Sequence, residues 1–255
     1  MQLSKRLQAV ADLVTVGNRV ADIGCDHAYT SIYLMENHIA SHIIAMDINK
    51  GPLERANENI EKTGFKDRIE TRLSDGAAKL KEDEVDTILI AGMGGSLMVK
   101  ILSDSESVVS MVNEFILQPQ SEIFLVRKYL HEIGCDIQYE TMFIDEGKYY
   151  VVIKATRDTK NMIANPSDEE DKKRHYDPKR LPKKYDKEVH YLYGKLLLEN
   201  KNRILEEFLE KEYHTTSNIL NHLTEKETEH AKERVEELKQ KLQYIIEGMN
   251  YYDKM

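Results

Sequence analysis

"DIGCDHAY", residues 22–29, lies where a strand-like run meets a helix-like run, and it decides the fold. The apolar run at 19–24 ends in Gly24, and a helical pattern begins near residue 28. A turn of this kind opens nucleotide-binding α/β folds, usually with several glycines. Here Gly24 is followed instead by Cys25, Asp26 and His27. The turn therefore predicts a nucleotide-type fold with a ligand other than a dinucleotide.

Strand-like and helix-like runs alternate from residue 19 to residue 133. Apolar runs at 19–24, 42–47, 68–73, 85–92 and 114–118 alternate with helical patterns near 28–38, 50–63, 95–103 and 121–133. This order predicts βαβ units and a parallel sheet. Two extended segments joined at 146–148 then predict an antiparallel hairpin at one edge. The expected fold is a mostly parallel, Rossmann-like α/β sheet.

The composition changes after residue 157. Residues 158–182 are charged and contain three prolines, so we expect a linker there. Apolar residues then recur at helical spacing, first at Tyr185, Val189, Leu192 and Leu196, and later at Val235, Leu238, Leu242, Ile245 and Met249. Such seams predict helices that pair, with a break at "HTTSN", 214–218. We expect three parts, 1–157, 158–182 and 183–255, the last an antiparallel coiled-coil hairpin; a solvated dimerisation arm is the alternative.

Composition and charge limit the class of protein. The chain has 255 residues, 41% hydrophobic and 32% charged, with no apolar run suited to a membrane span or an export signal. Cys25 and Cys135 are far apart, so we expect no zinc site, no disulfide and a cytoplasmic location. The net charge of -9 disfavours nucleic acid. Residues 172–187, however, hold eight basic and two acidic side chains, a local charge of +6.

Acidic and glycine residues follow four successive predicted strands. They are Asp22 and Gly24, then Asp47, then Asp75 and Gly76, and finally the glycine-rich segment 92–95. The carboxyl ends of parallel strands meet at one edge, where such sheets bind ligands. A carboxylate at position 47 can accept both hydroxyls of a ribose. One acidic residue at a strand end often only caps a helix, but the set together indicates a nucleoside site.

Asp26 distinguishes between nucleoside ligands. A pyrophosphate binds bare backbone N–H groups and tolerates no carboxylate beside them, so Asp26 disfavours an NAD-dependent oxidoreductase. S-adenosylmethionine carries a sulfonium and an α-ammonium group, and a carboxylate suits this cationic tail. Asp75 is then placed to accept the adenine amino hydrogens. We therefore expect S-adenosylmethionine as the cofactor and no metal ion.

Seven segments of the chain carry a family resemblance. They are "LSKRL" (3–7), "ADIGCDHAYTSIYL" (21–34), "AMDINKGPLERANEN" (45–59), "LSDGAAKL" (73–80), "IAGMGGSLM" (90–98), "LQPQ" (117–120) and "EGKYYVVI" (146–153). With them the chain resembles the class I methyltransferases, and more closely the bacterial tRNA (adenine-22-N1)-methyltransferase family. The resemblance implies methyl transfer from S-adenosylmethionine to N1 of adenosine 22 in the tRNA D-arm. It also implies that the C-terminal helices help to hold the tRNA.

The candidate cofactor-binding residues lie at the strand ends and in the first turn. They are Asp22, Gly24, Asp26, His27, Asp47, Ile48, Asp75, Gly76, Gly92 and Met93. The candidate catalytic residues are Asp26, which can stabilise charge on the methylated base or take a proton, and Tyr29, which can stack on that base. For Asp26 the simpler alternative is cofactor binding alone, and for Tyr29 it is helix packing. His27 has no assigned chemical role.

The candidate substrate-binding residues follow the fourth and fifth strands or lie in the basic segment. They are Gly94, Gly95, Gln118, Pro119, Lys172, Lys173, Arg174, Arg180, Lys183 and Lys184. The segment "AGMGGSL" (91–97) stands where amino-directed adenine methyltransferases carry (N/D)PP(Y/F), so the base-holding residues stay open. Basic residues interleaved with tyrosines suit RNA, although a charge run is also typical of a solvated linker.

Two further functions stay open on the sequence alone. One is a class I methyltransferase that acts on another RNA or on a small molecule, with the same fold and donor. The other is a non-catalytic RNA-binding protein whose helical hairpin is the working part. The expected protein is a monomer that binds tRNA and no membrane.

Overall fold

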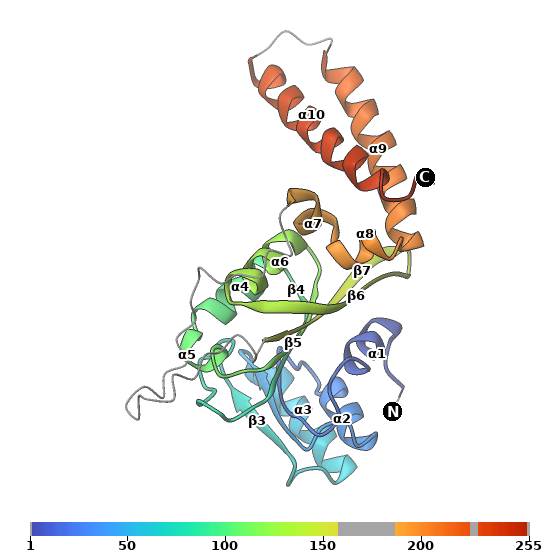
Figure 1. The fold of residues 1–255 in the computed structure, drawn as a ribbon. Helices are drawn as coiled ribbons and strands as arrows, with labels where there is room; N and C mark the ends of the chain where they lie inside the picture. Colours follow the sequence, from blue (N-terminus) through green and yellow to red (C-terminus); the bar gives the residue numbers. More distant parts are fainter. Residues whose placement is uncertain (1, 158–186, 225–228, 254–255) are drawn as a thin grey trace, which may run out of the picture.

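A seven-stranded sheet forms the centre of the computed structural model, which describes residues 2–157, 187–224 and 229–253 (Figure 1). The strands are β1 (Arg19–Ile23), β2 (His42–Asp47), β3 (Ile69–Leu73), β4 (Thr87–Met93), β5 (Glu114–Pro119), β6 (Cys135–Asp145) and β7 (Lys148–Arg157). Their order is β3-β2-β1-β4-β5-β7-β6. β7 is antiparallel to both of its neighbours and the other pairs are parallel. The predicted mostly parallel sheet with an antiparallel edge hairpin is confirmed.

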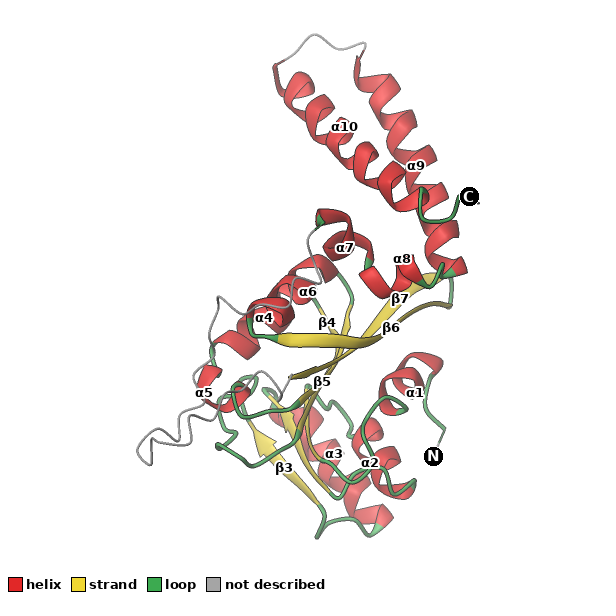
Figure 2. Ribbon diagram, in the orientation of Figure 1, coloured by secondary structure: helices red, strands yellow, loops and turns green. Residues whose placement is uncertain are grey.

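Helices cover both faces of the sheet (Figure 2). One layer holds α1 (Lys5–Ala11), α2 (Tyr29–Glu36) and α3 (Lys50–Thr63), and the other holds α4 (Gly95–Ser103), α5 (Glu106–Val109) and α6 (Ile123–Glu132). Alternate residues of a central strand pack into opposite layers: Ile88 of β4 joins the α4–α6 side and Leu89 joins the α1–α3 side. Burial on both faces explains why the central part of β4, residues 88–90, is apolar without alternation.

The strand order positions the ligand site. From β1 the chain moves outward through β2 and β3, then returns to place β4 on the other side of β1. Open α/β sheets bind ligands at such a switch point, outside the carboxyl ends of the strands. Gly24 follows β1 and Gly92 lies near the end of β4, so both glycines fall at this point.

The C-terminal helices are α7 (Glu188–Tyr193), α8 (Lys195–Glu199), α9 (Arg203–Thr224) and α10 (Glu229–Met249). α9 and α10 pair and project away from the sheet (Figure 1). The predicted C-terminal helices are confirmed, and coiled-coil packing between them stays a prediction. The side chains of Val189, Leu197 and Leu198 are buried in the cluster on the α4–α6 side of the sheet.

The predicted break at 214–218 is wrong, because these residues lie inside α9. The hydroxyl of Thr215 donates back to the carbonyl of Lys211 within the helix, instead of capping a new one. α9 begins instead after Asn202, whose side chain accepts hydrogen bonds from the next turn at Ile204 and Leu205. The chain also breaks at Gly194, so α7 and α8 replace the first part of the expected long helix.

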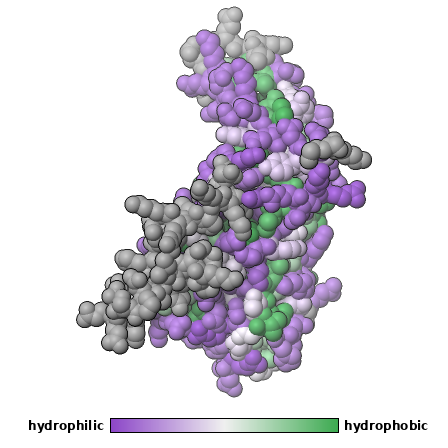
Figure 3. All heavy atoms as spheres, in the orientation of Figure 1, coloured by the Kyte–Doolittle hydropathy of each residue, from purple (hydrophilic) through white to green (hydrophobic). Residues whose placement is uncertain are grey.

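The predicted linker 158–182 lies entirely outside the described residues, and the three-part division stays a prediction. The face drawn in Figure 3 is mainly hydrophilic where the structure describes it, with small hydrophobic areas between polar side chains. Over the described residues, no helix combines the length and apolar character needed to cross a membrane.

Candidate functional site

A cavity of about 490 Å³ opens at the carboxyl ends of the central strands, a volume that suits a small-molecule ligand. All ten candidate cofactor-binding residues line it, and so does the second candidate catalytic residue, Tyr29. The cavity therefore brings together predicted site residues from the ends of β1, β2, β3 and β4.

The first turn has a strained backbone that is fastened to the sheet. Gly24, Asp26 and Ala28 all have positive φ, at 77°, 50° and 61°. A side chain is tolerated poorly in this region, and glycine avoids the penalty at position 24. The backbone N–H groups of Gly24 and Cys25 donate to the carbonyl of Met46 in β2, at 2.8 and 2.9 Å. Packing thus holds the turn in a shape that the local sequence alone disfavours.

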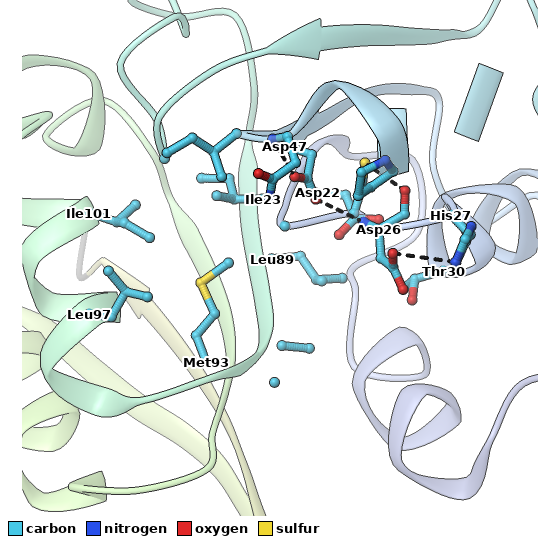
Figure 4. Close-up of a pocket in the computed structure, with 18 of the residues that line it drawn as sticks. Asp22, Ile23, Asp26, His27, Thr30, Asp47, Leu89, Met93, Leu97 and Ile101 are labelled. Atoms are coloured by element: carbon cyan, nitrogen blue, oxygen red, sulfur yellow. Dashed lines mark hydrogen bonds and ion pairs between the residues drawn. The ribbon is translucent and has the colours of Figure 1, made fainter. Parts of the chain in front are cut away.

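Three carboxylates gather on one side of the cavity, as Figure 4 shows for Asp22, Asp26 and Asp47. The Asp22 side chain is buried and accepts a hydrogen bond from the Ser31 hydroxyl at 2.6 Å. Burial raises the pKa of Asp22 to about 6, against the opposing effect of that hydrogen bond. Asp47 accepts from the backbone N–H of Asn49 at 2.8 Å. This side of the cavity favours a cationic group.

Apolar side chains form the other side of the cavity. Met93, Leu97 and Ile101 lie together there (Figure 4). Leu97 and Ile101 are four residues apart on α4 and so share one helix face. A Cβ atom at position 24 would lie 2.3 Å from the Met93 methyl carbon, so Met93 reaches over the first turn. The cavity therefore has one acidic side and one apolar side.

His27 and Cys25 have different surroundings within the turn. His27 Nε2 lies 3.5 Å from Asp26 Oδ1, and its ring centroid lies 5.4 Å from that of Tyr29. The Cys25 thiol is buried, which raises its pKa well above the ordinary value. A neutral buried thiol is a poor nucleophile, which agrees with a packing role. In the described ranges, no group of three or more His, Cys, Asp or Glu side chains is arranged so that it could hold a metal ion.

Four candidate substrate-binding residues do not line this cavity. The backbone at Gly95 packs against α6, since a Cβ there would lie 2.4 Å from the Glu122 carbonyl oxygen, and Gly94 caps α4. Pro119 is buried at the end of β5. Gln118 is fully buried and its Oε1 accepts from Arg6 Nη1 at 2.8 Å. The six basic candidates at 172–184 lie outside the described residues.

Sequence reasoning did not select several residues that do line the cavity. Arg6 comes from α1 and Gln120 follows β5, and both side chains lie near Gly92. The strand-end rule could have found Gln120, because it stands directly after an apolar strand. Leu97 and Ile101 offered no distinguishing signal, since apolar residues spaced by four also form ordinary helix cores.

Comparison with known proteins first gives the class. Residues 3–153 match the family described as "Methyltransferase domain", which covers the whole sheet up to β7 and the cavity. A chain with a methyltransferase fold and an acidic, nucleoside-sized cavity at its switch point belongs to the methyltransferase class of enzymes. An NAD-dependent oxidoreductase and a non-catalytic binding protein are thereby set aside.

Relatives that match over nearly the whole chain identify the family within the methyltransferase class. The chain is 31% identical over 252 residues to the tRNA (adenine(22)-N(1))-methyltransferase of Bacillus subtilis (strain 168), covering 98% of each chain. It matches the solved B. subtilis m1A22 tRNA methyltransferase TrmK at 30% identity and a TM-score of 0.82, over 97% of this chain and 99% of that one. A putative tRNA (m1A22) methyltransferase of Streptococcus pneumoniae, solved with S-adenosyl-L-methionine, matches at 27% identity and a TM-score of 0.77, over 97% and 100%. The chain belongs to the tRNA (adenine(22)-N(1))-methyltransferase family.

Proposed function

We propose that this protein transfers a methyl group from S-adenosylmethionine to N1 of adenosine 22 in the D-arm of tRNA. The observation that supports it best is the cavity at the switch point of the sheet, where buried Asp22 lies with its acidic neighbours. The match to the B. subtilis relative over 98% of this chain supports it as well. We extend the proposal to a monomer located in the cytoplasm.

The residues of the cavity fit S-adenosylmethionine. Asp22 and Asp26 provide negative charge for the α-ammonium and sulfonium end of the donor. Asp47 ends β2, the position where a carboxylate accepts ribose hydroxyls in related folds. Asp75 is exposed into the cavity after β3 and can accept the adenine amino hydrogens. Each part of the donor thus has a partner of matching chemistry.

The chemistry is a displacement at carbon. When bound, S-adenosylmethionine supplies an electrophilic methyl group on a sulfonium. The lone pair of adenine N1 forms the new bond, while the electrons of the methyl–sulfur bond stay on sulfur. The chain must place N1 close to the methyl group and exclude water, and Met93 and Leu97 serve the second need.

Asp26 and Tyr29 act on the target base in this proposal. Methylation leaves the adenine cationic at N1, and the Asp26 carboxylate can stabilise that charge or accept an amino proton. The Asp26 side chain is 69% exposed, so a base can reach it, and His27 Nε2 lies 3.5 Å from its Oδ1. Tyr29 is exposed at the cavity mouth, where it can stack on the base.

The tRNA must present adenosine 22 outside its stack, because N1 lies on the Watson–Crick edge. We assign the remaining RNA contacts to α9, α10 and the basic residues Lys172, Lys173, Arg174, Arg180, Lys183 and Lys184. The local charge of +6 at 172–187 and the projecting helical hairpin support this assignment.

The proposal is tested by comparing the wild type with Asp26→Ala. Thermal shift should show stabilisation by S-adenosylmethionine and none by NAD. With saturating donor, Asp26→Ala should slow single-turnover methylation of a tRNA transcript by about 100-fold or more, the usual size of an acid–base or charge-stabilising contribution. An unchanged rate would show that Asp26 has no catalytic role. Methyl transfer to another RNA or to a small molecule in place of tRNA would refute the proposed substrate.

A further inference from the structure

Gln120 occupies the part of the cavity that the donor residues leave open. The strand order sets β2, β1, β4 and β5 side by side, with Asp47 at the end of β2 and Gln120 directly after β5. Neighbouring strands are about 4.8 Å apart, so these two positions are separated by roughly 14 Å along the sheet edge. The donor residues Asp22, Asp47 and Asp75 belong to β1, β2 and the end of β3. The β4–β5 side is therefore the part of the cavity farthest from these three carboxylates.

The Gln120 side chain is exposed and its backbone is fixed. Its N–H donates to the carbonyl of Met93 at 2.9 Å, which ties it to the end of β4. Its Nε2 lies 3.6 Å from the position that a Cβ on Gly92 would take, and Arg6 Nη1 lies 3.2 Å from the same point. The two side chains thus converge on the glycine that follows the apolar part of β4.

Gln120 and its near neighbour Gln118 differ in how their amides are used. Gln118 is buried, its Oε1 accepts from Arg6 and its Nε2 donates to the carbonyl of Pro119. Among the interactions of the described residues, the side-chain amide of Gln120 has no hydrogen-bond partner. Gln120 therefore offers one acceptor and two donors to a ligand at the cavity rim.

We propose that Gln120 selects adenine by pairing with its Hoogsteen edge. The inference rests on the proposed function, because N1 must stay unpaired to attack the methyl group. Adenine offers an N6 hydrogen and the N7 acceptor on the Hoogsteen edge, and a glutamine amide pairs with both at once. Guanine offers two acceptors there, O6 and N7, which the amide cannot satisfy in the same way. Gln120 thereby orients the base and distinguishes it from guanine, while Asp26 and Tyr29 act on the oriented base.

The test exchanges one atom in the RNA and one side chain in the protein. tRNA carrying adenosine or 7-deazaadenosine at position 22 is methylated under single-turnover conditions with saturating donor. 7-Deazaadenine keeps N1 and the amino group but lacks the N7 acceptor. The wild type should methylate it about 5- to 10-fold more slowly, as expected for one lost hydrogen bond. Gln120→Ala should slow methylation of adenosine by about 5- to 150-fold and show no further loss with 7-deazaadenosine.

Controls separate base recognition from other causes. Gln138→Ala, an exposed glutamine on β6, should match the wild type with both RNAs. Gln120→Ala should keep its affinity for S-adenosylmethionine and its melting temperature. Equal methylation of both RNAs by the wild type would overturn the role of Gln120 but not the proposed function. A slower rate with 7-deazaadenosine that persists in Gln120→Ala would do the same. A wild type that leaves adenosine 22 unmodified overturns the proposed function and this inference with it.

Discussion

Replacing Arg127 with leucine removes half of a buried ion pair that connects the sheet to the C-terminal helices. Arg127 Nε donates to Glu140 Oε1 at 2.7 Å, and the two side chains are 1% and 0% exposed. Arg127 Nη1 also donates to the carbonyls of Tyr191 and Leu192 in α7, at 2.7 and 2.9 Å. One guanidinium therefore holds α6, β6 and α7 together.

Arg127→Leu should reduce the free energy of unfolding by about 3–5 kcal/mol, because an unpaired carboxylate stays buried. For a chain of this size that corresponds to a fall in melting temperature of roughly 6–20 °C. Burial already raises the pKa of Glu140, and the loss of Arg127 should raise it further. The folded variant then keeps a proton at pH values where the folded wild type has released it. Relative to the wild type, the loss should therefore grow with pH by up to about 1.4 kcal/mol per pH unit, from the pKa of Glu140 in the folded wild type up to its higher pKa in the folded variant.

The assay is denaturant unfolding of the full chain at pH 5.5 and pH 7.5, with two comparisons. Arg234→Leu removes an exposed partner of Glu237 and should cost at most about 0.5 kcal/mol. The double variant Arg127→Leu, Glu140→Leu should be more stable than Arg127→Leu alone, since no charge stays buried. A loss below about 1 kcal/mol in Arg127→Leu, or the same loss at both pH values, would refute the reasoning.

Three more outcomes follow from the site and the junction. Asp47→Ala should weaken S-adenosylmethionine binding by about 10- to 100-fold in calorimetry, as loss of a charged hydrogen-bond acceptor implies; unchanged affinity would contradict its ribose role. The pKa of Asp22 is about 6, above its ordinary value, so a cationic donor should bind more tightly as pH rises from 5 to 7, and Asp22→Asn should abolish that dependence. Gly194→Ala should lower the melting temperature by at least about 6 °C, because φ is 89° and a Cβ would lie 2.2 Å from Glu140 Oε2. Gly147→Ala, with similar φ and no atom within 4 Å, should cost clearly less, and equal losses would show that the contact is unimportant.

The sheet and the strand-end residues could be predicted because their signals are local. The apolar runs at 19–24, 42–47 and 85–92 end in Gly24, Asp47 and Gly92, and the run at 68–73 is followed closely by Asp75 and Gly76. Once the strands are parallel, their ends must share an edge. Asp22, Asp47 and Asp75 were found in this way without knowledge of any contact.

The remaining features depend on contacts that no local pattern reveals. Thr215 looks like a cap in sequence but bonds back within α9, so the break was misplaced. Gly95 looks like a ligand-approach glycine but makes room for the Glu122 carbonyl. All six residues of β5 are buried, including Gln118, and the strand ends at Pro119, so that Gln120 is exposed. Which of two glutamines faces the cavity is decided by tertiary structure.

The most direct test of the account is mass spectrometry of unmodified tRNA after incubation with the full chain and isotope-labelled S-adenosylmethionine. We expect one labelled methyl group per tRNA, recovered as 1-methyladenosine and mapped to position 22. Label at another nucleoside or position, or no transfer from a donor that binds the protein, would contradict it.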